Sequence, residues 1–268
     1  KPMEQLVNEA KAPVRDGIKE IMLIAQDSTF YGIDLYGERK LAELMDRLSD
    51  VEGLDWIRLH YAYPSKFPFD VLPIINSKPN ICKYLDIPIQ HISDNVLKSM
   101  RRGITKRRTE EVLDRIRSEV DNIALRTTLL VGHPGEYYQD FEELKDFVNR
   151  YQFNRLGVFT YSHEVGTHAG TLEDHVSQEI KSARADEIMG IQHDISFAHN
   201  QKLIGSTQKV IIDRIEGDSY IGRTQFDSPE VDNEVIISLN EGYLRVGDFT
   251  NATITGAESF DLIAKLNK

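Results

Sequence analysis

The chain has 268 residues, of which 40% are hydrophobic and 28% charged, and this composition predicts a folded protein with a sizeable core. Its formal net charge of −11 argues against a globally basic nucleic-acid binder. The single cysteine, Cys82, excludes a disulfide framework and any site built from several thiolates of this chain. No apolar run approaches the roughly 20 residues of a membrane span, and no secretory signal is visible, so we expect a cytoplasmic protein or fragment without membrane contact.

The first two thirds of the chain alternate strand-like apolar runs with amphipathic helical segments. The runs are rich in β-branched and aromatic residues and occupy residues 18–25, 56–63, 84–90, 123–131 and 156–161. Helical periodicity recurs between them, and Ser93 and Thr105 are placed to begin helices. This alternation predicts parallel strands with right-handed crossovers. Because the opening residues already read as a helix, we predict a partial β/α barrel or open sheet that lacks its first strand.

The last third changes character after a long helix predicted over residues 177–205. Short strand-like runs follow at 210–215, 219–224, 234–238 and 249–254, separated by turns, and they predict a small all-β barrel. We place the boundary near Gln208, which gives domains at residues 1–207 and 208–268. The second domain contains six Lys/Arg and eleven Asp/Glu residues, a net charge of −5.

Polar side chains gather where the predicted strands end. In β/α folds the carboxyl ends of the strands carry the functional site, so these side chains are candidates to converge on one ligand. Asp86 and Arg126 interrupt apolar runs, and a buried charge needs a partner. Ordinary strand polarity and helix capping remain the alternative reading. The candidates are Gln26, Asp27, Asp86, Gln90, His91, Arg126 and Thr128.

A turn rich in glycine follows the fourth run, at residues 132–136. Gly132 and Gly135 allow the backbone to approach a ligand, and free N–H groups there would favour a polar or anionic one. The turn lacks the Gly-Lys-Ser/Thr of a phosphate loop, and a plain strand-to-helix turn explains it equally well. Elsewhere, the spacing of the histidines at positions 163, 168 and 175 predicts no metal site, and Cys82 reads as a buried apolar residue. Since the chain has no Gly-x-Ser-x-Gly elbow, we assign no catalytic residue.

One basic cluster spans the end of one predicted helix and the start of the next. Cations at a helix C-terminus are stabilised by the helix dipole, which gives a purely structural explanation for those at the end of the first helix. Cations in the first turn of the following helix lack that support, so contact with a phosphate or a ribosomal surface is an open alternative. The cluster contains Lys98, Arg101, Arg102, Lys106, Arg107 and Arg108.

Four segments in order, residues 17–32, 85–103, 125–136 and 159–169, resemble the radical-SAM methylthiotransferases. The terminal barrel resembles the TRAM domain of these enzymes, so the resemblance covers essentially the whole chain. Ala25-Gln26-Asp27 and the run from Leu85 to His91 resemble the branch that modifies an aspartate of ribosomal protein S12 more than the tRNA-modifying branch.

This resemblance implies a transferase that inserts sulfur and a methyl group at the β-carbon of an S12 aspartate. The implied cofactors are S-adenosylmethionine (SAM) and two [4Fe–4S] clusters in the full-length enzyme. A SAM-derived radical would remove the hydrogen, and the second cluster would supply the methylthio group. The same resemblance suggests Gln26, Asp27, Gln90, Arg126, Thr128, Gly132 and Gly135 for cofactor binding, and Asp86, His91 and Arg102 for the substrate side.

The chain departs from this family in one important respect. The family's Cys-x-x-x-Cys-x-x-Cys loop belongs upstream of Lys1, so we expect this fragment to hold no cluster. His133 also replaces the commoner Phe. The expected partner is S12, with ribosomal RNA contact through residues 98–108, because an acidic barrel suits a basic protein better than a phosphate backbone. A tRNA-modifying enzyme, a non-catalytic ribosome-binding module and an ordinary β/α-barrel hydrolase or aldolase are the alternatives.

Overall fold

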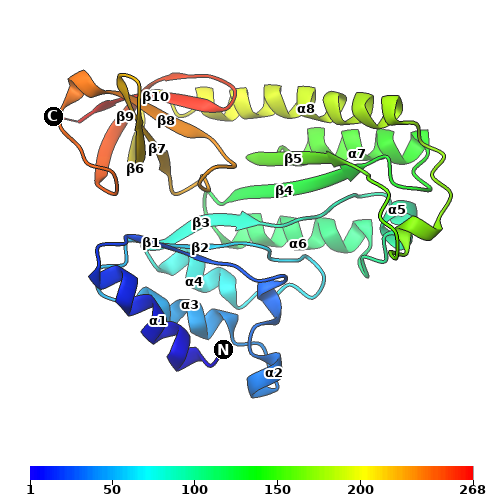
Figure 1. Cartoon of the computed structure of the whole chain (residues 1–268), viewed down its shortest axis with the longest axis horizontal. Helices are drawn as coiled ribbons and strands as arrows, with labels where there is room; N and C mark the ends of the chain where they lie inside the picture. The colour runs from blue at the N-terminus through cyan, green and yellow to red at the C-terminus, as the bar shows by residue number, and fades with distance from the viewer. Residues whose placement is uncertain (268) are drawn as a thin grey trace.

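The structure is a computed structural model that describes residues 1–267, and Figure 1 shows its two parts, a β/α sheet and a small β-barrel. The sheet contains five parallel strands in chain order. They are β1 (Glu20–Leu23), β2 (Trp56–Leu59), β3 (Ile81–Asp86), β4 (Ala124–Val131) and β5 (Arg155–Thr160). This arrangement confirms the predicted partial β/α barrel.

Helices before, between and after the strands cover one face of the sheet, and the last of them extends to the barrel. They are α1 (Met3–Arg15), η1 (Ser28–Phe30), α2 (Ile33–Tyr36), α3 (Leu41–Ser49), α4 (Val71–Ser77), α5 (Asp94–Ser99), α6 (Lys106–Glu119), α7 (Tyr138–Tyr151), η2 (Ala169–Thr171) and α8 (Gln178–Gln201). Thr105 caps α6 as predicted, since its hydroxyl accepts from the N–H of Arg108. The sequence analysis did not identify α4, and it began the third strand three residues late. None of the described helices is both long and apolar enough to cross a membrane.

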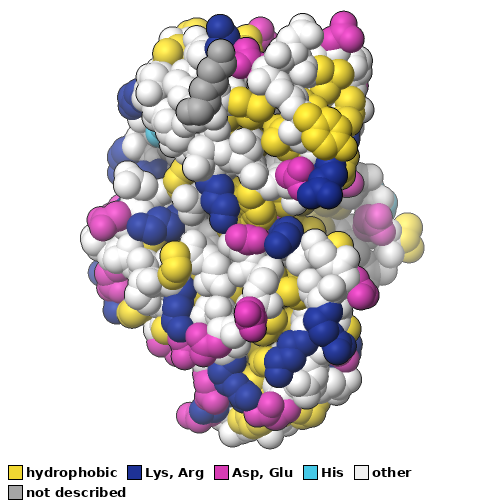
Figure 2. Space-filling view, turned by 90° about the vertical axis from the view of Figure 1, so that its left-hand side faces the viewer, with side chains coloured by type: hydrophobic (Ala, Val, Ile, Leu, Met, Phe, Trp, Pro, Cys, Tyr) yellow, Lys and Arg dark blue, Asp and Glu magenta, His cyan; other side chains and the backbone are white. Residues whose placement is uncertain are grey.

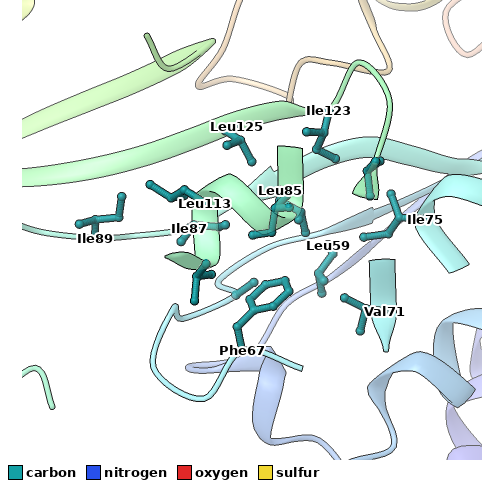
Figure 3. Close-up of a cluster of buried hydrophobic side chains, with 14 of the residues drawn as sticks. Leu59, Phe67, Val71, Ile75, Leu85, Ile87, Ile89, Leu113, Ile123 and Leu125 are labelled. Carbon is teal, nitrogen blue, oxygen red and sulfur yellow. The ribbon is translucent and has the colours of Figure 1, made fainter. Parts of the chain in front are cut away.

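The main core lies between the sheet and these helices. Alternate strand residues such as Leu59, Leu85 and Leu125 point into it and meet Val71 of α4 and Leu113 of α6 (Figure 3). This period of two follows from the pleat of a strand, which sends successive side chains to opposite faces. The other residues of each strand therefore line the opposite, concave face, where the sheet has no covering helices of its own.

The second domain is a closed five-stranded barrel in the order β10-β8-β7-β6-β9, as predicted for this part of the chain. Its strands are β6 (Thr207–Glu216), β7 (Ser219–Thr224), β8 (Glu234–Ser238), β9 (Phe249–Ala257) and β10 (Asp261–Leu266), with η3 (Leu239–Glu241) after β8. β10 was not predicted, yet it closes the barrel by pairing with β8 and β9. β6 begins one residue before the expected boundary.

The edge of the sheet at β1 has no strand partner beyond β2 among residues 1–267. An apolar cleft of about 330 Å³ lies along this edge, between β1, α1 and α3. Unpaired N–H and C=O groups at a sheet edge accept a further strand readily. The edge is therefore compatible with the additional first strand that the sequence analysis predicted.

Candidate functional site at the concave face of the sheet

The barrel covers the amino-terminal half of the concave face. Trp56, Cys82, Tyr84 and Ala124 of the sheet form a buried apolar cluster with Ile211 of β6. Trp56 also packs edge-on against Phe249, with ring centroids 4.8 Å apart. The barrel therefore closes the amino-terminal half of the concave face, and the carboxyl-terminal half remains for a ligand.

Arg58 anchors this interface although its side chain is fully buried. Its Nε donates to Glu20 Oε1 at 2.9 Å, and its Nη1 donates to the carbonyl of Gln225 in the barrel at 2.8 Å. Glu20 also pairs with Arg223 of β7. A buried guanidinium is tolerated only when its donors are satisfied in this way, so the sheet and the barrel depend on each other here.

Asp86 and Arg126 lie together on the concave face. Arg126 Nη1 donates to Asp86 Oδ1 at 2.9 Å, and Arg126 Nε lies 3.3 Å from Asp232 Oδ1, in the loop between β7 and β8. Tyr84 donates its hydroxyl to the other oxygen of Asp232 at 2.7 Å. Burial lowers the pKa of Arg126, but the nearby Asp86, Tyr84 and Asp232 outweigh it and raise that pKa overall. The partner that sequence reasoning required for Asp86 is thus present, and a second carboxylate comes from the barrel.

His60, the residue that follows β2, adjoins this group. Its Nε2 lies 3.0 Å from the hydroxyl of Ser228 in the barrel loop, and its Nδ1 lies 3.8 Å from Asp86 Oδ2. Burial lowers the pKa of His60 and outweighs the opposing influence of Asp86. His60 is therefore neutral near pH 7, and Arg126 is the cation that faces both Asp86 and Asp232.

The carboxyl-terminal half of the concave face is open. Gln90 and Thr128 are half-buried there, and the backbone of Gln90, with a positive φ of 71°, bonds to Thr128 and Leu130 on either side. Two exposed apolar side chains, Ile24 and Phe159, border the same surface. A wall that mixes amide, hydroxyl and apolar groups suits a ligand with both polar and apolar parts.

Gln26 and Asp27 follow β1 at the rim of this face. Gln26 is exposed, whereas Asp27 is partly committed to local structure. Its carboxylate accepts from the backbone N–H of Thr29 at 2.9 Å and from the Thr29 hydroxyl at 2.7 Å, and so begins η1. Asp27 therefore shapes the loop, and Gln26 is the freer of the two to touch a ligand.

The glycine turn after β4 differs from its expected role. The N–H groups of Gly132 and His133 are not free, because Glu136 Oε2 accepts from them at 2.7 and 3.3 Å. The backbone at Gly132 approaches helix α8, where an added Cβ would lie 2.3 Å from Lys181 Cγ. The turn thus packs against α8, and its N–H groups bind the carboxylate of Glu136 within the same turn. Arg184 of α8 also donates to this carboxylate at 2.7 Å. At Gly135 an added Cβ would lie 3.9 Å from Ser99 Oγ, an ordinary van der Waals contact.

His91 lies on the opposite side of the sheet from the concave face, beneath this turn. Its ring is fully buried, Nδ1 accepts from the N–H of Ser93 at 3.0 Å, and Nε2 has no hydrogen-bond partner among residues 1–267. Burial lowers the pKa of His91 to about 3. These facts correct the expectation that His91 faces a substrate: it supports the loop after β3 instead.

The basic cluster is largely engaged within the protein. Lys106 pairs with Glu143 at 2.6 Å, and Arg107 and Arg108 both reach Glu111. Arg102, a substrate-side candidate, donates to the carbonyl of Pro88 at 2.8 Å and stacks over Tyr63. Lys98 and Arg101 form no ion pair among residues 1–267, and both line an open groove of about 710 Å³.

The described residues do not fit an iron–sulfur cluster. Cys82 is 1% exposed, and burial raises the pKa of its thiol to about 12, so it is neither accessible nor readily ionised. Within residues 1–267, no group of three His, Cys, Asp or Glu side chains is placed to hold a metal ion. Cluster ligands require several thiolates, so we derive no reaction step through such a group on this chain.

Sequence reasoning missed the barrel's contribution to the site. Asp232 meets Arg126, and Ser228 meets His60, because the loop between β7 and β8 packs on the concave face. Asp232 lies 148 positions from Tyr84, and no local pattern links the two. One signal was available: Arg58 and Tyr84 are polar residues in apolar runs, and each required a partner from elsewhere.

Comparisons with known proteins agree with this architecture. A profile of the radical SAM superfamily matches residues 1–148, and a profile of the TRAM domain matches residues 204–266. Curated relatives in Flavobacterium johnsoniae and Porphyromonas gingivalis are each 54% identical to the chain, over 97% and 99% of its length. A relative in Chloroherpeton thalassium is 53% identical over 99%. All three are named ribosomal protein uS12 methylthiotransferase RimO, and the chain spans 60%, 62% and 62% of their lengths.

Two solved structures share the fold. Coproporphyrinogen III oxidase from Escherichia coli aligns with 83% of this chain and 60% of its own, with a TM-score of 0.56 and 13% identity. The radical S-adenosylmethionine methyltransferase TsrM from Kitasatospora setae aligns with 63% of this chain and 33% of its own, with a TM-score of 0.51 and 17% identity. At such identities the likeness concerns the fold alone.

Proposed function

Because the chain belongs to the radical SAM superfamily, we propose that it is part of a cytoplasmic methylthiotransferase that modifies an aspartate of ribosomal protein S12. The observation that carries the proposal is the 53–54% identity to enzymes of that name, which extends across both domains. The net change is replacement of a hydrogen on the aspartate β-carbon by a methylthio group.

The open half of the concave face supports SAM as a ligand of this chain. It combines the amide of Gln90, the hydroxyl of Thr128 and the guanidinium of Arg126 with apolar neighbours, and the barrel closes its inner end. SAM, when bound with a reduced cluster, supplies the radical that removes a hydrogen atom. The residues of this chain bind and orient the reactants and exclude water from one side.

Charge favours a basic protein as the partner of the barrel. Its net charge of −5 opposes a phosphate backbone and attracts a basic ribosomal protein. Figure 2, which views the left-hand side of Figure 1 with the barrel above and the sheet domain below, shows acidic and basic side chains interspersed across that whole face. The attraction is therefore diffuse there, and it should weaken as ionic strength rises.

The test uses the full-length enzyme, with its clusters reconstituted anaerobically, SAM and a sulfur source. Purified S12 and a tRNA pool are offered separately, and mass spectrometry looks for one added methylthio group on an aspartate or a nucleoside. We expect modification of S12 alone. Modification of tRNA alone would replace this proposal with the tRNA-modifying alternative, and SAM turnover without either product would exclude both substrates.

A second contact, with ribosomal RNA, is proposed for Lys98 and Arg101 because these two cations are exposed and lack ion pairs within the described part of the chain. The variant K98A/R101A should weaken binding to small ribosomal subunits. It should also reduce the slope of the logarithm of the binding constant against the logarithm of salt concentration by about two. The matched control, Arg107→Ala, removes a cation that already pairs with Glu111. Equal losses in both variants would argue against a specific contact.

A further inference from the structure

The loop between β7 and β8 forms part of the concave wall. It contacts four strands of the sheet on their concave face. The carbonyl of Gln225 accepts from Arg58 of β2, and Gln225 Oε1 accepts from the N–H of Lys83 in β3. Asp232 meets Arg126 of β4, and Asp227 accepts from Arg155 of β5 at 2.8 Å. A loop of the barrel thus packs against the concave face across four strands.

Arg126 is held from two sides by carboxylates of different domains. Asp86 accepts a hydrogen bond from Nη1, and Asp232 forms an ion pair with Nε. The side chains of both acids are almost fully buried, at 2% and 1% exposure, whereas Arg126 retains 17%. Tyr84 and the N–H of Ser228 fix the second oxygen of Asp232, at 2.7 and 2.9 Å, so this carboxylate has little freedom to turn.

The remaining amino group of Arg126 is available to a ligand. Nη2 donates no hydrogen bond within residues 1–267, and an added Cβ on Gly157 of β5 would lie 4.0 Å from it. Arg126, Gly157 and Asp232 all line a cavity of about 250 Å³ between the sheet, α8 and the barrel. A guanidinium fixed at Nη1 and Nε presents Nη2 in a defined direction to an oxygen acceptor.

Asp86 also binds the backbone at the rim of the site. Asp86 Oδ2 accepts from the N–H of Tyr61 at 3.3 Å, and the Asp86 carbonyl accepts from Ala62 at 2.9 Å. Tyr61 has a positive φ of 53°, and its carbonyl accepts from Ser28 after β1. The orientation of Asp86 therefore affects the backbone that follows two strands.

We infer that Asp232 is a positioning residue: from the barrel, it holds Arg126 in line with Asp86 and so completes the reactant site of the sheet. The inference rests on the proposed function, because it gives Arg126 a reactant to contact. It also predicts that the barrel is needed for the reaction itself, in addition to any docking of a partner.

Asp232→Asn in the full-length enzyme tests this, since the amide keeps the size of the side chain, removes its charge and replaces one of its two acceptor oxygens by a donor. Asp227→Asn is the matched control, because Asp227 is equally buried in the same loop and pairs with Arg155 outside the Asp86–Arg126 group. SAM cleavage, SAM affinity by equilibrium dialysis and the thermal midpoint are measured for each. We expect Asp232→Asn to lose about tenfold or more in kcat/KM for SAM cleavage, as removal of an orienting partner often does.

Asp227→Asn should lower the thermal midpoint at least as much and retain kcat/KM. Asp232→Glu should restore part of the lost kcat/KM. Tyr84→Phe, which removes one of the two hydrogen bonds to Asp232 Oδ2, should show a smaller defect in the same direction even if Asp232→Asn does not fold. Equal behaviour of the two Asn variants, or normal kcat/KM in both Asp232→Glu and Tyr84→Phe, would overturn the inference. SAM cleavage is measured without S12, so a failure of the S12 assignment leaves this result interpretable.

Discussion

Arg58 and Glu20 form a buried ion pair, 2.9 Å apart, between neighbouring strands, and both residues also bind the barrel. Each charge offsets part of the cost of burying the other at the concave face. The pair therefore ties the stability of the sheet to the presence of the second domain.

Replacement of Arg58 by Met should destabilise the protein strongly, because Glu20 then keeps a buried charge with Arg223 as its remaining cation. Loss of one member of a buried pair typically costs about 3–5 kcal/mol, and we expect the lower end of that range here. Chemical denaturation measures the free energy of unfolding. The control is Lys19→Met, which removes a surface pair with Asp55 and should cost about 1 kcal/mol or less. Similar losses in both variants would contradict this role for Arg58.

Gly132 should not tolerate a side chain. Gly132→Ala places a methyl group against Lys181, whose ammonium pairs with Asp174 at 2.6 Å, and it also strains a φ of 76°. Gly37 has a nearly identical φ of 74° but nothing within 4 Å, so Gly37→Ala isolates the backbone cost. That cost is about 1 kcal/mol, and overpacking at Gly132 should add about 1–3 kcal/mol. Thermal or urea unfolding of the two variants compares them directly, and equal midpoints would show that α8 moves away freely.

The sequence predicted the parallel sheet, the long helix and the second barrel because their hydrophobic periods are local. It also predicted that Asp86 and Arg126 need partners, since charges in apolar runs are costly. It could not predict that Asp232 is such a partner, because its contact with Arg126 depends on how two domains pack. The turn at Gly132 illustrates the same limit: local pattern identified the turn, but whether its N–H groups bind a ligand or Glu136 depends on the rotamer of one side chain and on Arg184 of a distant helix.

Acid should weaken the fold through His91. Its pKa is about 3 in the folded protein because of burial, against an unfolded value near 6.5. The unfolded chain therefore binds the proton first as the pH falls below 6.5, and stability is lost progressively down to about pH 3. At pH 5 this amounts to about 2 kcal/mol.

His91→Asn keeps an acceptor for the N–H of Ser93 but cannot titrate, so its stability should fall less between pH 7 and pH 5 than that of the parent protein. Denaturant titrations at the two pH values give this difference. The control variant, His163→Asn, changes an exposed ring and should leave the acid dependence as it was. Parallel slopes for His91→Asn and the parent would assign the acid sensitivity to other buried histidines such as His60 and His133.

Cys82 should be dispensable for cofactor content. In the reconstituted full-length enzyme, Cys82→Ala should retain the iron and sulfide of the parent protein, because the thiol is buried at the barrel interface and does not ionise readily. The free energy of unfolding should fall by about 1 kcal/mol through loss of packing. Metal analysis and denaturation provide the two measurements. A reproducible drop in iron content without unfolding would show that Cys82 contributes to a cluster.

The packing of the barrel loop against the concave face also affects the order in which the chain can fold during synthesis. Tyr84 and its acceptor Asp232 are separated by 148 positions, so a ribosome working at roughly 5–20 residues per second exposes the first about 7–30 s before the second. During that interval the cluster around Trp56 and Cys82 has no cover from this chain, and Arg58 lacks its barrel partner. The nascent sheet is thus an intermediate with exposed apolar side chains and a guanidinium that lacks one hydrogen-bond acceptor. We expect chaperones to release it when the last strands emerge.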